Sequence, residues 1–390
     1  LHVERLLKFM LWACGGSRWF WDGPQEAGEF LNKRFSSHPC GGFDRDFMAK
    51  VYQEPFCGTI GDEVPEARGL ASPLGRNLEG CRIGFDLGGS DRKVAAVIDG
   101  EVVFSEETHW DPYHQTDPAY HKAGIMDSIE KAKAHLPKLD AIGGSSAGVF
   151  VDDRPRVASL FRGISDSDFA EKIRPMFIDL GKELGVPLSI INDGEVTALA
   201  ASMSLDENAV LGIAMGTSEA TGYVDTQGRV TSWLNELAFA PVDYSPNAPA
   251  DEWSGDVGCG VQYFSQQAVG RLIPKTSLSI DSNLGLPEKL ERVQEFMAEG
   301  NGEAASIYRT IGTYLGYGVA HYASFYALSH ALILGRVTSG EGGTIILEEA
   351  EKVLETEFPG LNDRITFHQP DEKNKRHGQA IAAASLPSTD

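Results

Sequence analysis

A strand-like segment that ends in a turn of small and hydroxyl-bearing residues occurs twice in this chain of 390 residues. The first copy is CRIGFDLGGS, residues 81–90, and the second is AVLGIAMGTS, residues 209–218. Further strand-like runs follow each copy, RKVAAVI and EVVFSEE after the first and TGYVDT and RVTSWL after the second. The repeat, at a spacing of about 125 residues, predicts two similar α/β lobes that face one ligand across a cleft. The alternative is that two ordinary β-meanders resemble each other by coincidence.

The two turns have the composition of a phosphate-binding site. Gly88 and Gly89 remove side chains so that backbone N–H groups can converge on an anion, and Ser90 adds a hydroxyl donor. Asp86, at the end of the strand, offers the hard oxygen ligands that a hydrated Mg²⁺ prefers. Residues 216–217 repeat the glycine and the hydroxyl in the second turn. The alternative is a purely structural hairpin, because glycine also serves the unusual backbone angles of tight turns.

Changes of composition divide the chain into three parts. Residues 1–80 form an N-terminal extension of unassigned role, rich in Trp, Phe and Gly, that ends in the connector EARGLASPLGRNLEG. Residues 81–205 alternate strand-like and helix-like runs, as expected of a first lobe. Residues 206–390 form the second lobe, with a long helix expected over 303–329. Its internal glycines are unfavourable in a helix unless something packs closely there, and the small-residue segment GQAIAAASLP predicts a helix that lies tightly on a sheet.

The charge balance disfavours several classes of binding partner. A net charge of −22 disfavours non-specific binding to nucleic acid or to an anionic membrane. The extension carries 9 Lys or Arg against 11 Asp or Glu, so it lacks the basic face of a DNA-binding domain.

The sequence also indicates where the protein works. No apolar run approaches the roughly 20 residues that a membrane span requires. Charges interrupt the opening LHVERLLKFMLWACGG, so we expect a helix packed on a core and not a signal peptide. Five scattered cysteines without CxxC spacing indicate a reducing compartment, and we predict a cytoplasmic protein.

Residues 82–387 resemble the ROK family of sugar kinases and repressors, within the actin-like ATPase and hexokinase superfamily. The matching stretches, in chain order, are DLGGSDRKVAAV, AIGGSSAGV, GVPLSIINDGEVTALAA, GIAMGTSEATGYV, YLGYGVA, LILGRVTSGEGG and HGQAIAAAS. The resemblance implies a ribonuclease H-like α/β fold with ββαβ-type units duplicated around a nucleotide cleft. It also implies ATP and Mg²⁺ as cofactors, a small-molecule sugar as substrate and, as in many relatives, a homodimer.

The same resemblance implies roles for individual residues. Asp193, in IINDG, corresponds to the general base that takes the proton of the attacking sugar hydroxyl. The implied sugar-binding residues are Asn192, Glu236, Gly148 and Ser159. The implied nucleotide-binding residues are Asp86, Gly88, Gly89, Ser90, Gly216, Thr217, Gly335 and Ser339, and Asp86 also holds Mg²⁺ through water.

The surroundings of Asp193 suit this role on physical grounds as well. A buried strand, PLSIIND, meets the helix GEVTALAASMSL there, which orients a side chain over a cleft. Phosphoryl transfer needs alignment and charge stabilisation more than covalent help, so one carboxylate about 3 Å from the nucleophilic oxygen is enough. The alternative role for Asp193 is a helix N-cap, and the two roles are compatible.

Several functional stretches depart from the family pattern. The second phosphate loop, usually GTGIGGG, is GTSEATG here, and Glu219 adds a negative charge. The adenosine loop, usually LGGGVS, is LGRVTS, where Arg336 either contacts the nucleotide or is a surface residue. The family's zinc site needs a histidine and a CxCGxxGC cluster. This chain has no histidine between residues 135 and 321 and only Cys259 in that region, so no zinc is expected.

The sugar side has changed too. The family's GEIGH reads NELAF here, which keeps Glu236 and loses the histidine. The loop DEWSGD, residues 251–256, offers an aromatic face and acceptors to a carbohydrate, or is an ordinary acidic surface loop.

Together these observations predict ATP-dependent phosphorylation of a sugar or sugar-derivative hydroxyl. The alternative is a non-catalytic sugar-sensing or regulatory protein on the same scaffold. The altered loop 216–222 and the missing zinc ligands favour this alternative, whereas Asp86 and Asp193 oppose it. A DNA-binding repressor is the least favoured reading, because the extension is acidic.

Overall fold

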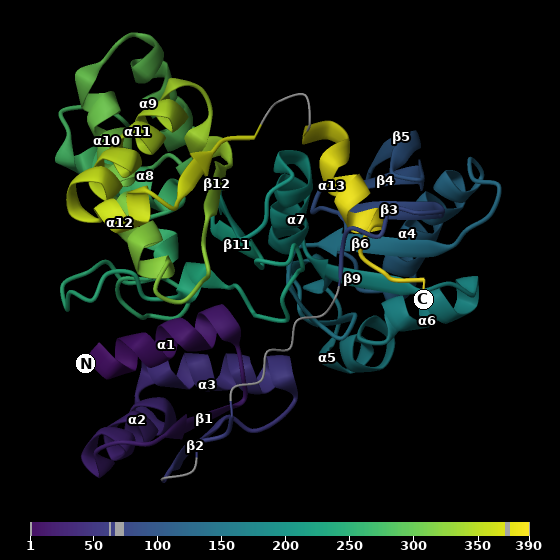
Figure 1. The fold of residues 1–390 in the computed structure, drawn as a ribbon, viewed down its shortest axis with the longest axis horizontal. Helices are drawn as coiled ribbons and strands as arrows, with labels where there is room; N and C mark the ends of the chain where they lie inside the picture. The colour runs from purple at the N-terminus through teal and green to yellow at the C-terminus, as the bar shows by residue number, and fades with distance from the viewer. Residues whose placement is uncertain (1, 62–63, 67–73, 371–374, 390) are drawn as a thin grey trace.

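The computed structural model describes residues 2–61, 64–66, 74–370 and 375–389. They form two mixed sheets with helices packed on both, and an N-terminal unit that lies along the lower edge of the molecule in Figure 1. The predicted α/β class is confirmed. No helix among the described residues is long and apolar enough to cross a membrane.

The first lobe is built on a five-stranded sheet of order β5-β4-β3-β6-β9. Its strands are β3 Cys81–Leu87, β4 Asp91–Ile98, β5 Glu101–His109, β6 Ala141–Ser146 and β9 Leu188–Asn192. The strands β3, β4 and β5 are antiparallel neighbours, whereas β6 and β9 continue the sheet in parallel with β3. Asp99 and Gly100 both have positive φ between β4 and β5, so the predicted Asp-Gly hairpin is confirmed.

Helices cover both faces of this sheet. On one face, α4 Pro118–Lys133 and α6 Met176–Leu184 pack on apolar residues of β3 and β4. On the other face lies the C-terminal helix α13, Lys375–Ala384, so the chain returns from the second lobe to the first (Figure 1). A Cβ atom at Gly84 would lie 1.9 Å from the carbonyl oxygen of Ala380, and one at Gly143 would lie 1.6 Å from that of Ala383. The expected tight helix-on-sheet contact is therefore present.

The second lobe has a four-stranded sheet of order β11-β10-β12-β13. Its strands are β10 Val210–Met215, β11 Glu219–Val224, β12 His330–Leu334 and β13 Thr366–His368. Helix α7, Asp193–Leu205, packs on one face and stands between the two sheets in Figure 1. The other face carries α8 Gln266–Leu272, α9 Leu286–Ala298, α10 Gly302–Tyr322 and α11 Glu341–Glu357.

The prediction of a strand at RVTSWL is wrong. Only Val230 pairs there, through isolated bridges to Val224 and Leu74. The carboxylate of Asp225 accepts backbone N–H groups of Gln227 and Arg229 and the guanidinium of Arg229, which closes a tight loop after β11. The chain then leaves the sheet edge for the N-terminal unit, so a third antiparallel strand does not form.

The glycines of the long helix α10 have the expected function. A Cβ at Gly312 would lie 2.6 Å from the carbonyl oxygen of Ile346, and one at Gly316 would lie 2.6 Å from the Val353 side chain, both on α11. The prediction of a close neighbour is confirmed, and that neighbour is α11.

The N-terminal extension is a compact unit of three helices and a two-stranded parallel sheet. Its elements are α1 His2–Cys14, β1 Arg18–Trp21, α2 Gln25–Ser37, α3 Pro39–Tyr52 and β2 Cys57–Ile60. Phe9 and Trp12 of α1 are fully buried in the apolar core of the second lobe. The opening segment is therefore a helix packed on a core, as expected.

The contact between α13 and the first sheet generates a prediction about stability. We expect Gly143→Ala to lower the free energy of unfolding by about 1 to 3 kcal/mol, because the new methyl group would overlap backbone that has no room to move. Gly302→Ala is the control, since it is helical with nothing within 4 Å of the added atom. Urea unfolding of both variants gives the measurement, and an unchanged midpoint for Gly143→Ala would contradict the packing.

Candidate functional site

The carboxyl ends of the parallel strands β3, β6 and β9 meet at one edge of the first sheet, where ligands bind in open α/β sheets. Asp86 lies near the end of β3 and accepts a hydrogen bond from Ser145 on β6. Burial raises the pKa of Asp86 despite this hydrogen bond and the nearby charge of Lys93. A half-buried carboxylate therefore lies at this edge of the sheet.

Asp193 is the first residue of α7, directly after β9. Burial, and then repulsion from Asp86, raise the pKa of Asp193 to about 6. The helix N-cap is Asn192 and not Asp193: the Asn192 side chain accepts the Gly194 N–H at 2.7 Å. Asp193 is thereby positioned at the helix start without being its cap.

Two glycines bring the start of α7 against the second lobe. A Cβ at Gly222 of β11 would lie 2.2 Å from the carbonyl oxygen of Gly194, and one at Gly194 would lie 2.5 Å from that of Thr221. Asp193 is thus held from the first lobe through β9 and from the second lobe through β11. Gly222 is one of the glycines that the altered phosphate loop retains, and in the structure it allows β11 to pack closely on the start of α7.

Glu236 comes from the second lobe, directly before the short helix η3 Leu237–Phe239. Burial, and then repulsion from Asp193, raise the pKa of Glu236 to about 7. Its backbone N–H donates to the carbonyl oxygen of Trp12 at 3.0 Å. Asp193 therefore lies close enough to both Asp86 and Glu236 for electrostatic repulsion. All three residues were singled out from the sequence.

Gly148 and Asn192 also lie together. The Asn192 amide donates to the carbonyl oxygen of Gly148 at 2.8 Å. Gly148 has a φ of +126° and packs against Ala158, the residue before Ser159. Ser159 is exposed at the start of the short helix η1 Ser159–Phe161. The four implied sugar-binding residues thus come from two places: Gly148, Asn192 and Ser159 from the first lobe, and Glu236 from the second lobe.

The first glycine turn is a closed hairpin. The Gly88 N–H donates to the carbonyl oxygen of Asp91 at 2.9 Å, and a Cβ at Gly89 would lie 2.1 Å from the Tyr113 hydroxyl. The Ser90 hydroxyl donates to the Asp91 carboxylate at 2.6 Å. The sequence did not point to Asp91 or Tyr113. The Asp91 carboxylate accepts the hydrogen bond of the Ser90 hydroxyl, and the Tyr113 phenol covers Gly89.

The second turn is more open. The Gly216 N–H donates to the carbonyl oxygen of Ser218 at 3.0 Å, and Thr217 is exposed. Gly335, with a φ of +103°, lies against this turn, since a Cβ there would be 2.5 Å from the Met215 carbonyl oxygen. Ser339 is exposed after the short helix η6 Arg336–Thr338, in which Arg336 is exposed as well. Gly335 therefore joins the implied adenosine loop to the second turn.

Glu219 does not point toward the phosphate side. It stands opposite Met215 in the β10–β11 register, and Met215 belongs to the second-lobe core. The Tyr322 hydroxyl donates to Glu219 Oε1 at 3.5 Å, and its Oε2 lies where a Cβ at Gly260 would come within 2.4 Å. Burial, with a weaker repulsion from Glu236, raises the pKa of Glu219 to about 8.

The loop 251–256 differs from the carbohydrate surface that the sequence suggested. Asp251 is buried and accepts the backbone N–H and the hydroxyl of Ser254, both at 2.7 Å. Asp256 is buried against Arg5 and Lys8. Trp253, 80% exposed, keeps the predicted aromatic face free for a ligand, and Glu252 is exposed beside it, while the carboxylates of Asp251 and Asp256 are buried inside the protein.

The residues around Cys259 do not fit the zinc site that is typical of the ROK family. The Cys259 thiol is buried and donates to the carbonyl oxygen of Asp256 at 3.7 Å. Burial, and then the nearby Asp256, raise the pKa of this thiol, so it stays protonated and is a poor metal ligand. Across the described residues, no group of three or more His, Cys, Asp or Glu side chains could hold a metal ion.

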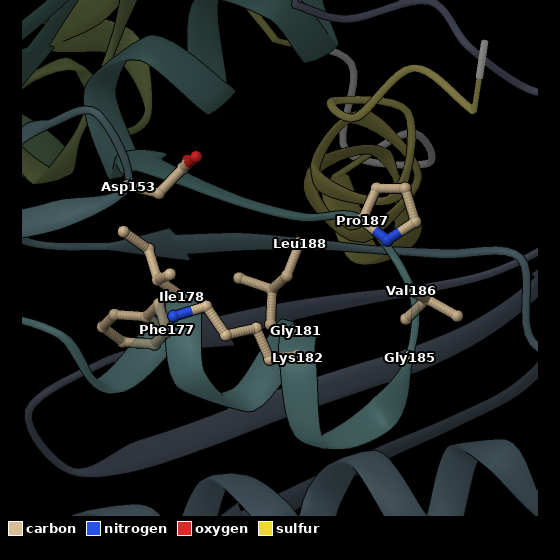
Figure 2. Close-up of a pocket in the computed structure, with 9 residues that line it drawn as sticks. All are labelled: Asp153, Phe177, Ile178, Gly181, Lys182, Gly185, Val186, Pro187 and Leu188. Carbon is tan, nitrogen blue, oxygen red and sulfur yellow. The ribbon is translucent and has the colours of Figure 1, made fainter.

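A surface hollow of about 480 Å³ lies at the other end of β9 (Figure 2). Asp153 borders it from the turn between the strands Val149–Val151 and Arg154–Val157, and residues from α6 to the start of β9, among them Lys182 and Pro187, complete its lining. Because it lies at the amino end of a parallel strand, it is separate from the edge that carries Asp86 and Asp193.

Comparison with known proteins supports the fold. No protein-family model matches the sequence, and no curated protein matches it. Among solved structures, a ROK hexokinase from Thermus thermophilus is 17% identical with a TM-score of 0.60, covering 78% of this chain and 96% of that one. A ROK family glucokinase from Streptomyces griseus, in complex with glucose and AMPPNP, is 19% identical with a TM-score of 0.54, covering 78% and 98%.

A ROK family transcriptional regulator, homologous to the MLC protein of E. coli, is equally similar. It is 18% identical with a TM-score of 0.60, covering 79% of each chain. At such identities the likeness establishes the fold, which is that of the ROK and hexokinase structures, as the sequence predicted. The fold is shared by sugar kinases and by a regulator, so the activity must be argued from the site.

The buried Glu219 generates a prediction about stability and pH. Its pKa of about 8 lies above the ordinary value of 4.5, so between these pH values the folded protein keeps a proton that the unfolded chain has released. Rising pH in this window therefore destabilises the fold, at about 1.4 kcal/mol for each full unit of difference. We expect Glu219→Gln to raise the melting temperature at pH 8 and to flatten its decline between pH 5 and 8.

Differential scanning calorimetry across that range is the measurement. Glu291→Gln, an exposed position on α9, is the control and should leave the pH dependence as it is in the wild type. A decline between pH 5 and 8 that is as steep in Glu219→Gln as in the wild type would show that the carboxylate is already charged in the fold.

Proposed function

We propose that the protein is an ATP-dependent carbohydrate kinase that phosphorylates a hydroxyl of a sugar or sugar derivative. The observation that carries this proposal is the convergence of Asp86, Asp193 and Glu236 from two lobes, with the pKa of Asp193 raised to about 6 by burial and by Asp86. A carboxylate with this pKa is ionised at neutral pH and is also a stronger base than an ordinary aspartate, as a general base requires.

The proposed chemistry divides among the residues as follows. Asp193 accepts the proton of the sugar hydroxyl as the oxygen attacks the γ-phosphorus of ATP. Glu236 and Asn192 hold other sugar hydroxyls, with Gly148 and Ser159 beside them. The turns at 86–90 and 216–217 hold the phosphates, and Gly335 and Ser339 border the adenosine. Alignment by these groups lowers the barrier without a covalent intermediate.

The residues present fit a magnesium ion. Asp86 and Asp193 repel each other in a half-buried setting, and a cation between the phosphates and Asp86 would relieve that repulsion. When bound, Mg²⁺ neutralises charge on the phosphate oxygens. Asp86 is the residue that would hold it, through water as the resemblance implies.

A second candidate function, a sugar-binding regulatory protein without turnover, has a specific observation in its favour. Asp91 lies in the first phosphate turn with its carboxylate on Ser90, and Tyr113 covers Gly89. Both features weaken a seat for an anion. One of the similar solved structures is a transcriptional regulator, which supports this candidate as well.

We also propose that the protein acts in a reducing compartment such as the cytoplasm, because all five cysteines are free. The substrate and ATP are the proposed partners, together with a homodimer as in many relatives. Nucleic acid and membrane surfaces are disfavoured by the net charge of −22.

The central test of the kinase is a sugar-panel phosphorylation assay on the wild type and on Asp193→Asn. We expect the substitution to reduce kcat by at least about a hundredfold, because the attacking hydroxyl loses its proton acceptor. Calorimetry with Mg²⁺ and ATP should give an unchanged Kd. Asp46→Asn, an exposed carboxylate on α3, serves as the control. Turnover that survives in Asp193→Asn removes this base from the mechanism.

Asp91 provides a test of the phosphate turn. We expect Asp91→Asn to tighten the binding of Mg²⁺ and ATP by roughly threefold to tenfold, because a negative charge leaves the turn and a neutral amide oxygen holds the Ser90 hydroxyl less strongly than a carboxylate. The backbone bond that closes the hairpin uses the Asp91 carbonyl and is retained. Isothermal titration calorimetry at low and high salt measures the effect, which should shrink with salt. Weaker binding in Asp91→Asn would place the phosphates elsewhere.

A further inference from the structure

Helix α1 of the extension ends on the segment that carries Glu236. The last carbonyl groups of a helix have no partner within it. Here the carbonyl oxygen of Trp12 accepts the Glu236 N–H at 3.0 Å, and that of Ala13 accepts the Asn235 N–H at 2.9 Å. The backbone N–H of the proposed sugar-binding residue is therefore held by the N-terminal extension, while its carbonyl oxygen accepts the Phe239 N–H at 3.2 Å within its own lobe.

A buried cluster of six charged side chains ties the same helix to loop 251–256. Lys8 Nζ lies 2.7 Å from Asp44 Oδ2 and 2.8 Å from Asp256 Oδ2. Arg5 adds a bidentate contact to the Asp256 carboxylate, with distances of 2.7 and 3.0 Å. The remaining members are Glu4 and Arg34, which bond to each other at 2.5 Å. The cluster holds three positive and three negative groups, so it is balanced.

Lys8 and Asp256 keep their charges in this cluster, whereas burial raises the pKa of Asp44 overall against the attraction of Lys8. Burial alone would lower the pKa of Lys8, but the attraction of Asp44 and Asp256 raises it overall. Burial likewise opposes ionisation of Asp256, and the bonds and charges of Arg5 and Lys8 lower its pKa overall. Removal of one partner from such a group is costly, since it leaves a buried charge uncompensated.

Asp256 is connected in turn to the segment after Glu236. Pro241 and Cys259 form a β-bridge, and the Val242 N–H donates to the Gly258 carbonyl oxygen at 2.8 Å. The Gly260 N–H donates to the Ala240 carbonyl oxygen at 2.9 Å. Residues 235–243 and 256–260 therefore form one unit, which α1 holds at Glu236 through backbone bonds and at Asp256 through the charge cluster.

The extension also contacts the first lobe. Helix α3 lies against the hairpin of β7 Val149–Val151 and β8 Arg154–Val157, which follows Gly148 directly. The same helix carries Asp44, the partner of Lys8. One compact unit thus touches the sugar-side segments of both lobes.

We propose that the N-terminal extension is a brace for the sugar-binding segment 235–260, and that Lys8 is its key positioning residue. In the resembling family, the corresponding segment carries the zinc ligands. Here a metal does not fit, and an ion cluster from an added helix holds the segment in its place. The proposal deepens the proposed function, because it names what positions Glu236, but the brace itself is a property of the folded chain.

The test measures the order of the segment without any ligand. Hydrogen–deuterium exchange is compared between the wild type and Lys8→Met. We expect peptides from 235–260 to exchange about tenfold faster or more in the variant, because the segment opens locally when its tie is cut. Peptides from β3 and β6 of the first lobe should exchange as in the wild type. Lys33→Met, on the exposed side of α2, is the control.

A second variant guards against simple misfolding. Lys8→Met with Asp44→Asn removes one positive and one negative charge, so the cluster stays balanced while the tie from Lys8 to Asp256 is lost. Faster exchange confined to 235–260 in this double variant supports the brace, and Lys8→Arg should restore protection. Unchanged exchange of the segment, or equally faster exchange throughout the protein in both variants, would overturn the proposal.

The kinetic readout separates positioning from stability. For the sugar that the wild type phosphorylates in the panel, we expect Lys8→Met to raise KM for the sugar about tenfold and KM for ATP less than twofold. An equal rise in both overturns the positioning role. Absence of turnover in the wild type would count against the kinase alone, since the exchange experiment needs no substrate and still decides whether the brace exists.

Discussion

Repulsion between half-buried carboxylates is the constraint around which this molecule is arranged. Asp86, Asp193 and Glu236 approach from three elements, and each has its pKa raised by burial, with Asp193 and Glu236 raised further by a neighbouring carboxylate. Such a group is unfavourable for folding, so the surrounding structure must hold it in place. Glycine contacts hold the start of α7 on β11, and helix α1 holds Glu236. Because these carboxylates lower the stability of the fold and are nevertheless held together, we infer that this edge of the sheet is functional.

The sequence predicted those features that depend on local chemistry. The Asp99-Gly100 hairpin requires positive φ and has it, and the glycines of α10 and the small residues of α13 lie where neighbouring backbone leaves no room for a side chain. In each case a single residue type meets a steric requirement, so the pattern is readable without the rest of the fold. The positions of Asp86 and Asp193 near strand ends were also predictable, because the strand-forming residues directly precede each aspartate in the sequence.

Other features depended on partners distant in sequence. RVTSWL has the composition of a strand, but Asp225 closes a loop before it and α1 captures the chain at Asn235. The direction of Glu219 followed from its register against Met215, which a sequence does not reveal. Asp256 looked like a surface acid in an acidic loop, whereas Arg5 and Lys8, about 250 residues earlier, bury it. Tertiary contacts overrode local propensity in all three cases.

The brace that we propose links the extension to the absence of zinc ligands in the sequence. A segment that carries a carboxylate near other carboxylates, as Glu236 does, needs an external hold, because their repulsion pushes it outward. A metal supplies that hold through strong, short bonds to few residues. An ion cluster is weaker per contact and requires desolvation of every member, so it works only inside a sizeable covered surface. Helices α1 to α3 provide that cover with Phe9, Trp12 and the residues packed on them. In the proposed brace, the size of the extension follows from the covered surface that a buried charge cluster needs.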